Sequence, residues 1–195
     1  FQGTATFGST ALTSAGHQDI FIAKLDSNGN YLWAQKAGGV ILDRGHAITA
    51  LSDNSSIVTG EFCGTATFGS TTLTSAGSTD VFVAKLDSNG DYLWVQRGGG
   101  TDQDTAKAIT SLSDNSSIIT GFFYGSATFG NTTLTSAGEE DVFIAKLDGS
   151  GNYLWAKKGG GTDTDNAYAI TNLNENSSQS IFIAKLDSNG NWLNL

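Results

Sequence analysis

The sequence has few of the residues that several common classes of protein require. Only ten of its 195 residues are Lys or Arg, against nineteen Asp and Glu, and the net charge is −9. Nucleic acids and anionic membranes are bound by clustered basic residues, so neither is an expected partner. The single cysteine, Cys63, excludes an internal disulfide. No run of 18 apolar residues occurs, so no helix inserted in a membrane is expected.

Proline and methionine are also absent, and neither a signal peptide nor a starting methionine is visible. We therefore expect a mature product, a fragment or the ordered part of a longer protein. Helical periodicity is absent throughout, whereas glycine (25 residues) and β-branched residues are abundant, which predicts an all-β fold. A low-charge composition rich in Ser, Thr, Asn and Gly is typical of secreted bacterial modules and predicts an extracellular or cell-surface location.

What the sequence does contain is a repeat. The stretch DIFIAKLDSNGNYLWA at 19–34 returns at 80–95 and 141–156, and a shortened copy occupies 180–195. The offset between full copies is 61 residues (80 − 19, and again 141 − 80). Each copy reads as two strands around a tight turn, because Asn-Gly and its relatives tolerate positive φ between apolar runs. So faithful a repeat indicates a structurally modular unit.

One complete unit, residues 39–99, contains four strand candidates and an insert. A Gly-rich linker is followed by strands at 46–51 and 56–62, and the hairpin at 80–95 closes the unit. The insert at 64–77 has two Thr-rich runs, which predict a small additional hairpin. Four antiparallel strands in a meander are the pattern of a β-propeller blade. A parallel β-helix is the alternative, although its coils lack paired hairpin turns, and a β-sandwich would not explain the repeat.

The repeat predicts a single domain whose ends are incomplete. It divides into a partial blade at 1–38, full blades at 39–99 and 100–160, and a truncated blade at 161–195. The truncated blade lacks the part that corresponds to the second strand and the insert. Open ends expose apolar blade faces and unpaired strand edges. Self-association is therefore expected, because a second copy, another protein or more polypeptide must close a ring, and stacking into a fibre would also cover the ends.

The pattern TGxFxGTATFGxTTLTSAGxxDxFVAKLDxxGxYLWA extends over essentially the whole chain. It resembles the bacterial SBBP-type β-propeller repeat. The resemblance implies large secreted or surface-attached proteins, often with several domains. It implies no catalytic residues, and none is carried over to this sequence.

The Asp-x-Asn-Gly turns carry the candidate metal ligands. These are Asp26, Asn28 and Asn30 in the first copy and Asp87, Asn89 and Asp91 in the second. Their spacing is similar to that of a calcium loop, but an EF-hand needs a 12-residue loop that ends in a bidentate Glu, which is absent. A hairpin turn is the favoured interpretation. No cofactor is expected, and Ca²⁺ is the one metal that the pattern suggests.

Acidic pairs occur in the Gly-rich linkers between units. They are Asp102 with Asp104, and Asp163 with Asp165. Paired carboxylates can perform acid–base chemistry, but repetition in register favours a structural role. The two histidines, His17 and His46, are replaced in the other copies, so we expect them to be exposed. No catalytic set can be assembled from these spacings.

Trp33, Trp94 and Trp155 occupy the same position in three copies. If exposed, they could stack on sugar rings; if buried, they would pack between blades, and repetition in register favours packing. We therefore expect a non-enzymatic extracellular propeller module for adhesion, scaffolding or assembly. A glycan-binding, lectin-like propeller is the alternative, and an enzyme acting on glycans is the least favoured class.

Overall fold

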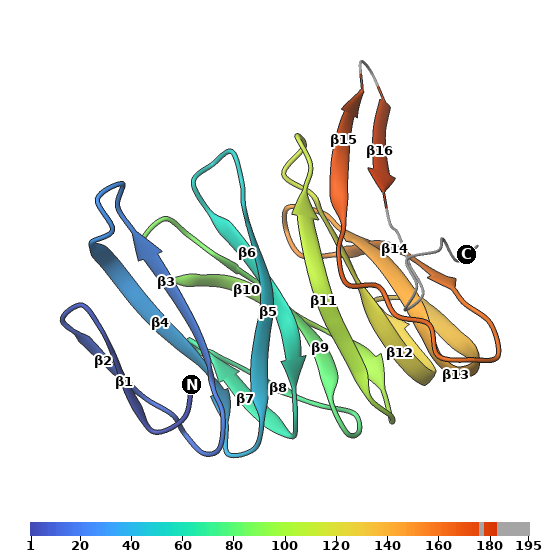
Figure 1. The fold of residues 1–195 in the computed structure, drawn as a ribbon, viewed down its shortest axis with the longest axis horizontal. Coiled ribbons are helices and arrows are strands. Elements are labelled where there is room, and N and C mark those ends of the chain that lie inside the picture. The colour runs from blue at the N-terminus through green and yellow to red at the C-terminus, as the bar shows by residue number, and fades with distance from the viewer. Residues whose placement is uncertain (176–177, 183–195) are drawn as a thin grey trace, which may run out of the picture.

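The computed structural model describes residues 1–175 and 178–182, and this part of the chain contains strands and no helix. The strands are β1 (Thr4–Phe7), β2 (Thr10–Thr13), β3 (Ile20–Leu25), β4 (Tyr31–Gly39), β5 (Asp43–Ala50), β6 (Ser56–Phe62), β7 (Thr65–Phe68), β8 (Thr71–Thr74), β9 (Asp80–Leu86), β10 (Tyr92–Gly100), β11 (Asp104–Ser111), β12 (Ser117–Phe129), β13 (Thr132–Leu147), β14 (Tyr153–Gly159), β15 (Thr171–Glu175) and β16 (Ser178–Phe182). In Figure 1 the chain runs from hairpin β1–β2 on the left to β12, β13 and β14 on the right. The predicted all-β fold class is confirmed. A helix long and apolar enough to cross a membrane is not found in the described residues.

Two complete four-stranded meanders form the centre of the molecule. The second sheet has the antiparallel order β5-β6-β9-β10, and the third sheet has the order β11-β12-β13-β14. This is the blade pattern expected from the repeat. The first sheet contains β3 and β4, and β15 pairs with β16 alone among the described residues. Strands β4 and β10 run to Gly39 and Gly100, each one residue past the predicted unit boundary.

Turn chemistry fixes where these hairpins reverse. In the turn between β3 and β4, the backbone N–H of Asp26 donates to the carbonyl of Asn30, and Gly29 has a φ of 83°. Asn54 and Asn115, in the turns after β5 and β11, also have positive φ, at 63° and 59°. Asparagine is one of the few side chains that tolerate this region, because it hydrogen-bonds locally. The turns therefore set the register of the strands beside them.

The insert hairpin pairs with the preceding unit, which the sequence did not predict. Strand β7 pairs antiparallel with the end of β4, and its register places Ala37 opposite Phe68 and Gly39 opposite Ala66. The same contact recurs one unit later, where the end of β10 pairs with the second half of β12. The hairpin therefore lies beside the last strand of the preceding sheet and adds strands to that sheet. In this way two adjacent sheets are joined by backbone hydrogen bonds as well as by side-chain packing.

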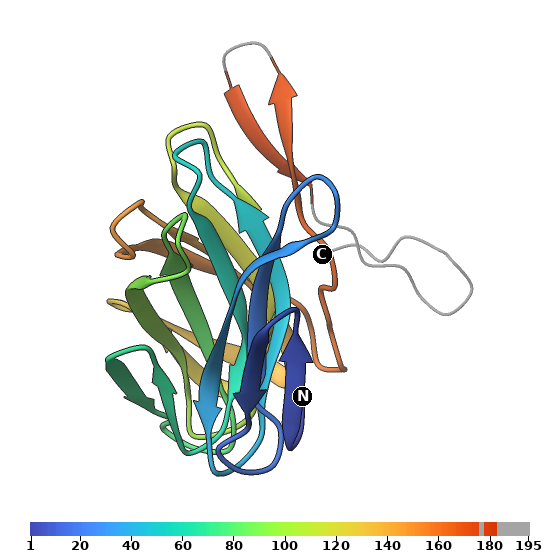
Figure 2. The same cartoon turned by 90° about the vertical axis from the view of Figure 1, so that its left-hand side faces the viewer.

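Two apolar cores lie between successive sheets. One joins the first sheet to the second, and the other joins the second to the third. Figure 2 shows the sheets one behind another when the molecule is seen from the side of β1 to β4. The aligned phenylalanines of β9 and β13, Phe82 and Phe143, are fully buried in these cores, whereas the equivalent Phe21 of β3 is 49% exposed. The first sheet therefore presents an uncovered face.

Candidate functional site

The repeated tryptophans lie at the junctions between sheets. The Trp33 indole donates its Nε1–H to the carbonyl of Ser88 at 3.0 Å, in the turn of the next unit. A Cβ on Gly90 of that turn would lie 2.8 Å from the Trp33 ring. Trp94 makes the same contacts with Gly149 and Gly151 one unit later. Trp33 and Trp94 thus each pack against the turn of the next sheet.

Trp155 is partly buried on β14. The turn that would correspond to its partner in the fourth copy lies outside the described residues.

The Asp-x-Asn-Gly turns use their carboxylates within the turn. The Asp26 Oδ1 accepts hydrogen bonds from the backbone N–H groups of Asn28 and Asn30, and Oδ2 accepts one from the Asn30 side chain. These bonds hold the pKa of Asp26 below its usual range, the Asn30 side chain having the largest effect. Within the described residues, no three acidic, His or Cys side chains gather as a metal site would require. Calcium binding stays an untested prediction.

The Asp87 carboxylate has the same arrangement, with Oδ1 accepting from the backbone N–H groups of Asn89 and Asp91. The side chain of Asp148 repeats it in the third copy. Asx-type bonding of this kind stabilises a turn without any ligand. The three turns therefore act first as hairpin reversals.

Buried acidic pairs lie beside the glycines at each sheet junction, but they are not the pairs that the linker sequence suggested. A Cβ on Gly99 would lie 2.8 Å from Asp104 Oδ2 and 2.9 Å from Asp80 Cγ, so these two carboxyl groups face each other across the glycine. Asp19 and Asp43 flank Gly38 in the same way, and Asp141 and Asp165 flank Gly160. Asp102 instead lies against Gly125.

Burial has the largest effect on the pKa values of Asp104 and Asp43 in these pairs. Burial, together with the nearby Asp80 carboxyl, raises the pKa of Asp104 to about 7. Burial likewise raises the pKa of Asp43 to about 6. The Asp104 Oδ2 accepts from the Gly100 N–H at 2.6 Å, and the Arg97 guanidinium donates to Asp80. Because Asp80 and Asp104 are fully buried, a substrate could not reach them, and their geometry is that of a structural junction.

A second polar cluster joins the second and third sheets, and the sequence reasoning missed it. Glu61 of β6 is almost fully buried, accepts a hydrogen bond from the Thr105 hydroxyl at 2.5 Å and contacts Arg44 at 3.2 Å. Burial alone would raise the pKa of Glu61, but hydrogen bonds from His46 and Thr105 bring it to about 2. The sequence did contain a signal for this cluster. Glu61 is the one charged residue of β6, and the equivalent position of the next unit is Phe122.

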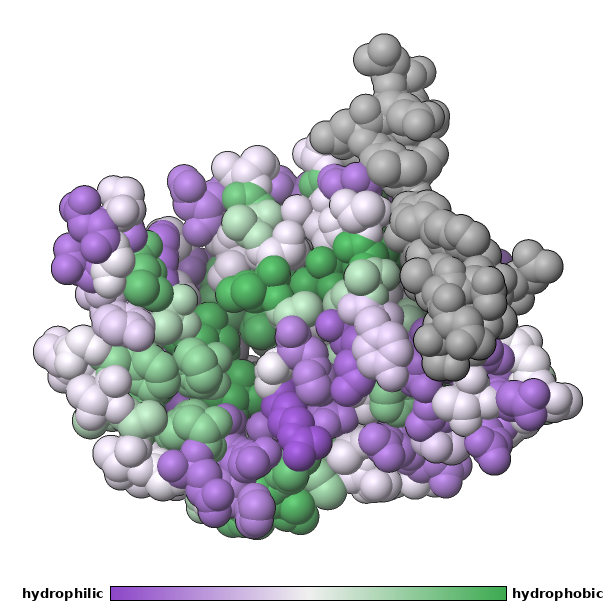
Figure 3. Space-filling model, in the orientation of Figure 1, coloured by the Kyte–Doolittle hydropathy of each residue, from purple (hydrophilic) through white to green (hydrophobic). Residues whose placement is uncertain are grey.

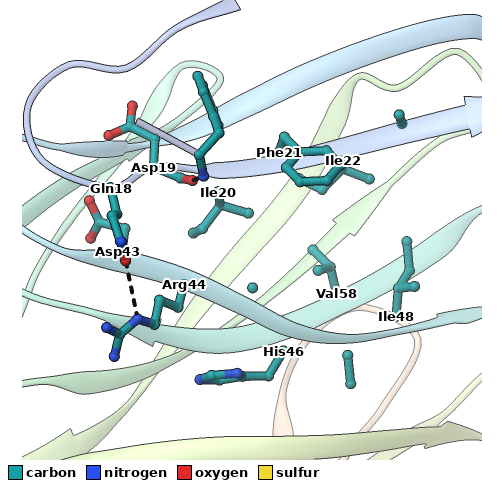
Figure 4. A pocket seen from close by; sticks show the side chains of 14 residues that line it. Gln18, Asp19, Ile20, Phe21, Ile22, Asp43, Arg44, His46, Ile48 and Val58 are labelled. Atoms are coloured by element: carbon teal, nitrogen blue, oxygen red, sulfur yellow. Dashed lines mark hydrogen bonds between the residues drawn. The ribbon is translucent and has the colours of Figure 1, made fainter. Parts of the chain in front are cut away.

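An open hollow of about 490 Å³ lies beside β3 (Figure 4). Consecutive residues of β3, from Ile20 to Ala23, line it together with β5 and Val58 of β6, so the edge of β3 faces the hollow. In the second sheet the corresponding edge of β9 is covered by β6. The hollow therefore occupies the position that the two inner strands of a complete sheet would fill.

Apolar side chains continue from this hollow onto the surface. Phe21 and Leu25 are about half exposed, at 49% and 46%, whereas their equivalents Phe82 and Leu86 are fully buried. Ile48 of β5 is also exposed, and Figure 3 shows apolar patches over the region of β3 and β5. Exposed apolar surface beside an unpaired strand edge is a feature of protein-interaction sites.

The fold and this surface define a β-propeller-type repeat protein with an open first sheet. No protein-family model matches the chain, so the SBBP-type resemblance has no support from that source. The chain is 29% identical over 164 residues to an uncharacterised WD repeat-containing protein of Acanthamoeba polyphaga mimivirus, covering 74% of this chain and 12% of that protein. It is 28% identical over 178 residues to the regulatory protein FlaEY of Caulobacter vibrioides, covering 86% of this chain and 19% of FlaEY. The chain therefore spans a small part of both relatives.

Proposed function

We propose that this chain is a non-enzymatic protein-interaction module that acts in adhesion, scaffolding or assembly. The observation that carries the proposal is the open first sheet, where Phe21 is half exposed although both of its repeat equivalents are fully buried. Similarity to a WD repeat-containing protein supports it, because WD repeats build propellers. The module binds protein through this face and edge.

The acidic groups fit a scaffold better than an enzyme. The carboxyl groups of Asp80 and Asp104 are sealed at a sheet junction, and Glu61 is held by Arg44 and Thr105. A catalytic acid or base must come within hydrogen-bonding reach of its substrate, and these groups are covered by the fold. Their role in this proposal is to orient neighbouring sheets.

The module works outside the cell or on its surface and associates with itself. The composition supports the location, since the chain has few charged residues and a net charge of −9. The uncovered face of the first sheet and the free edge of β3 support self-association, because a second copy carries sheets built to cover just such a face.

Sedimentation velocity over a wide range of concentrations tests this function. The wild-type protein should form species heavier than 20.3 kDa as the concentration rises. Phe21→Ser should weaken association by ~10-fold or more, since a buried Phe contributes about 1.5–3 kcal/mol. Leu154→Ser is the matched control, because Leu154 is similarly exposed but its equivalents Leu32 and Leu93 are exposed as well. A species that stays at 20.3 kDa at all concentrations would contradict the proposal.

A further inference from the structure

We propose that two copies of this chain associate head to tail, with β1 of one copy pairing with the end of β14 of the other. The predicted antiparallel register places Phe7 opposite Gly159, Thr6 opposite Gly160 and Ala5 opposite Gly161. This inference rests on the proposed function, and it specifies the partner and the pairing.

The contact already occurs twice within the chain. Strand β7 pairs with the end of β4, with Phe68 opposite Ala37, Thr67 opposite Gly38 and Ala66 opposite Gly39. One unit later Phe129, Thr128 and Ala127 stand opposite Gly98, Gly99 and Gly100. Moving this pattern by one further repeat places the end of β14 where a third hairpin should bind. The proposed register is therefore the internal register, transferred without adjustment.

The hairpin β1–β2 is a donor without an acceptor among the described residues. It forms a two-stranded sheet of its own. Ala5 and Phe7 remain partly exposed, whereas their equivalents Ala66 and Phe68 are fully buried beneath the preceding sheet. Nothing lies within 4 Å of a Cβ built on Gly29, whereas the equivalent glycines of the next two units carry a tryptophan ring. The first unit thus lacks the contacts that the second and third units each receive from the unit before them.

The end of β14 is the matching acceptor. A Cβ on Gly39 would lie 1.9 Å from the carbonyl oxygen of Thr65, and one on Gly100 would lie 1.8 Å from that of Ser126. Only glycine permits so close an approach of another backbone. Gly161 holds the same position, is exposed, and has no backbone near its Cβ, the nearest atom being Asp165 Oδ2 at 4.0 Å. This glycine leaves room for a strand that none of the described residues supplies.

The sequence supplies no hairpin of its own for that position. The Thr-rich hairpin motif occurs at 4–13, 65–74 and 126–135, and residues 162–195 contain no further copy. The second and third motifs are paired with β4 and β10. One donor, at 4–13, and one acceptor, at 159–161, are left over. Because they are halves of the same contact, a second copy of the chain satisfies both.

An engineered disulfide tests the register directly. In a Cys63→Ser background, Phe7→Cys combined with Gly159→Cys should give a disulfide-linked dimer under mild oxidation. Position 159 accepts a side chain, because its equivalent in the first unit is Ala37, which lies opposite Phe68. The control pair is Leu12→Cys with Gly159→Cys, since Leu12 lies on the far strand β2 and should not cross-link.

A single substitution tests the acceptor without breaking the fold. Gly161→Val should reduce the dimer at least tenfold at a fixed concentration, while the circular dichroism spectrum and thermal midpoint of the monomer stay those of the wild type. Gly149→Ser is the matched control, because Ser27 and Ser88 hold that position in the other units. It should leave the dimer unchanged.

The outcomes separate this inference from the proposed function. Association that survives Gly161→Val and gives no cross-link between positions 7 and 159 overturns the head-to-tail pairing but leaves an interaction module. A wild-type protein that stays monomeric at every concentration overturns both.

Discussion

Asp104 and Asp80 show how single residues shape a junction between sheets. Both carboxyl groups are fully buried on either side of Gly99, and Asp80 Oδ1 and Asp104 Oδ1 have no hydrogen-bond partner. Two carboxylates so close together cannot both be charged without a cost in stability. One of them therefore holds its proton at pH values where exposed aspartates are ionised.

The raised pKa values predict that stability falls with increasing pH. Asp104 has a pKa of about 7 in the folded protein, against an ordinary value of 3.8, so the folded state binds more protons between those values. The stabilisation is complete below about pH 4 and is lost as the pH rises through 7, by up to ~4 kcal/mol. Asp104→Asn should flatten this dependence and raise stability at pH 8.

Urea denaturation at pH 5 and pH 8 measures the effect. The Asn Oδ1 can still accept the Gly100 N–H, so the bond that Asp104 makes in the wild type is kept. Asp163→Asn is the control, since Asp163 is exposed and lies outside the Asp80–Asp104 pair. Equal pH dependence in Asp104→Asn and the wild type would show that the buried pair does not titrate in this range.

At the scale of the element, the insert hairpin connects each sheet to the one before it. It adds backbone hydrogen bonds to the last strand of the preceding sheet, and it places Phe68 in the core between the first and second sheets. Phe68 also contacts the rings of Phe62, Phe82 and Tyr92. The hairpin therefore contributes both to pairing and to packing.

Removing this anchor should destabilise the protein strongly. Phe68→Ala should lower the free energy of unfolding by about 3–5 kcal/mol, as expected for a fully buried Phe. Leu93→Ala is the comparison, because Leu93 is 56% exposed and should cost well under about 1 kcal/mol. Chemical denaturation of both variants checks this, and similar losses in the two would contradict the role given to the hairpin.

Gly100, which lies opposite the insert hairpin of the next unit, gives an independent prediction. Gly100→Ala forces a methyl group to within 1.8 Å of the Ser126 carbonyl oxygen, so we expect a loss of about 1–3 kcal/mol. Gly161→Ala meets no such backbone within its own chain and should leave the stability of the monomer nearly unchanged. Thermal unfolding at low concentration distinguishes the two substitutions, and an equal loss in both would refute the close-approach explanation.

Many of the strands and turns could be predicted from the sequence. Alternating apolar residues and Asn-Gly turns located the strands of the second unit, because turn geometry and burial both act locally. The partner of the insert could not be predicted, since the receiving residues Gly38 and Gly39 carry no side-chain pattern. Glu61 with Thr105, and Asp80 with Asp104, were missed for a related reason. Each pair is brought together by the stacking or pairing of strands, which no local spacing records.

The whole molecule is a row of sheets with complementary ends. The second sheet lies between two apolar cores, whereas the first sheet has an open face and a free edge. Figures 1 and 2 both show hairpin β15–β16 projecting beyond the other strands, at the opposite end of the row from β1–β2. Stability of such a row comes from contacts between neighbours, so an uncovered end is the least stable part.

Net charge gives a prediction for the assembly as a whole. Two copies with a charge of −9 each repel one another, and the proposed contact is made by apolar side chains and backbone. Added salt screens this repulsion, so the dimer should become stronger as ionic strength rises. Sedimentation equilibrium in low and high NaCl measures this. Weaker association at high salt would indicate an interface held by ion pairs.

Amide hydrogen exchange of β1 tests the central claim most directly. If β1 pairs with β14 of another copy, the N–H groups of Thr4–Phe7 that face that strand should be protected at high protein concentration as strongly as those of β7, and protection should fall on dilution. Fast exchange of β1 at every concentration, beside a protected β7, would contradict the account.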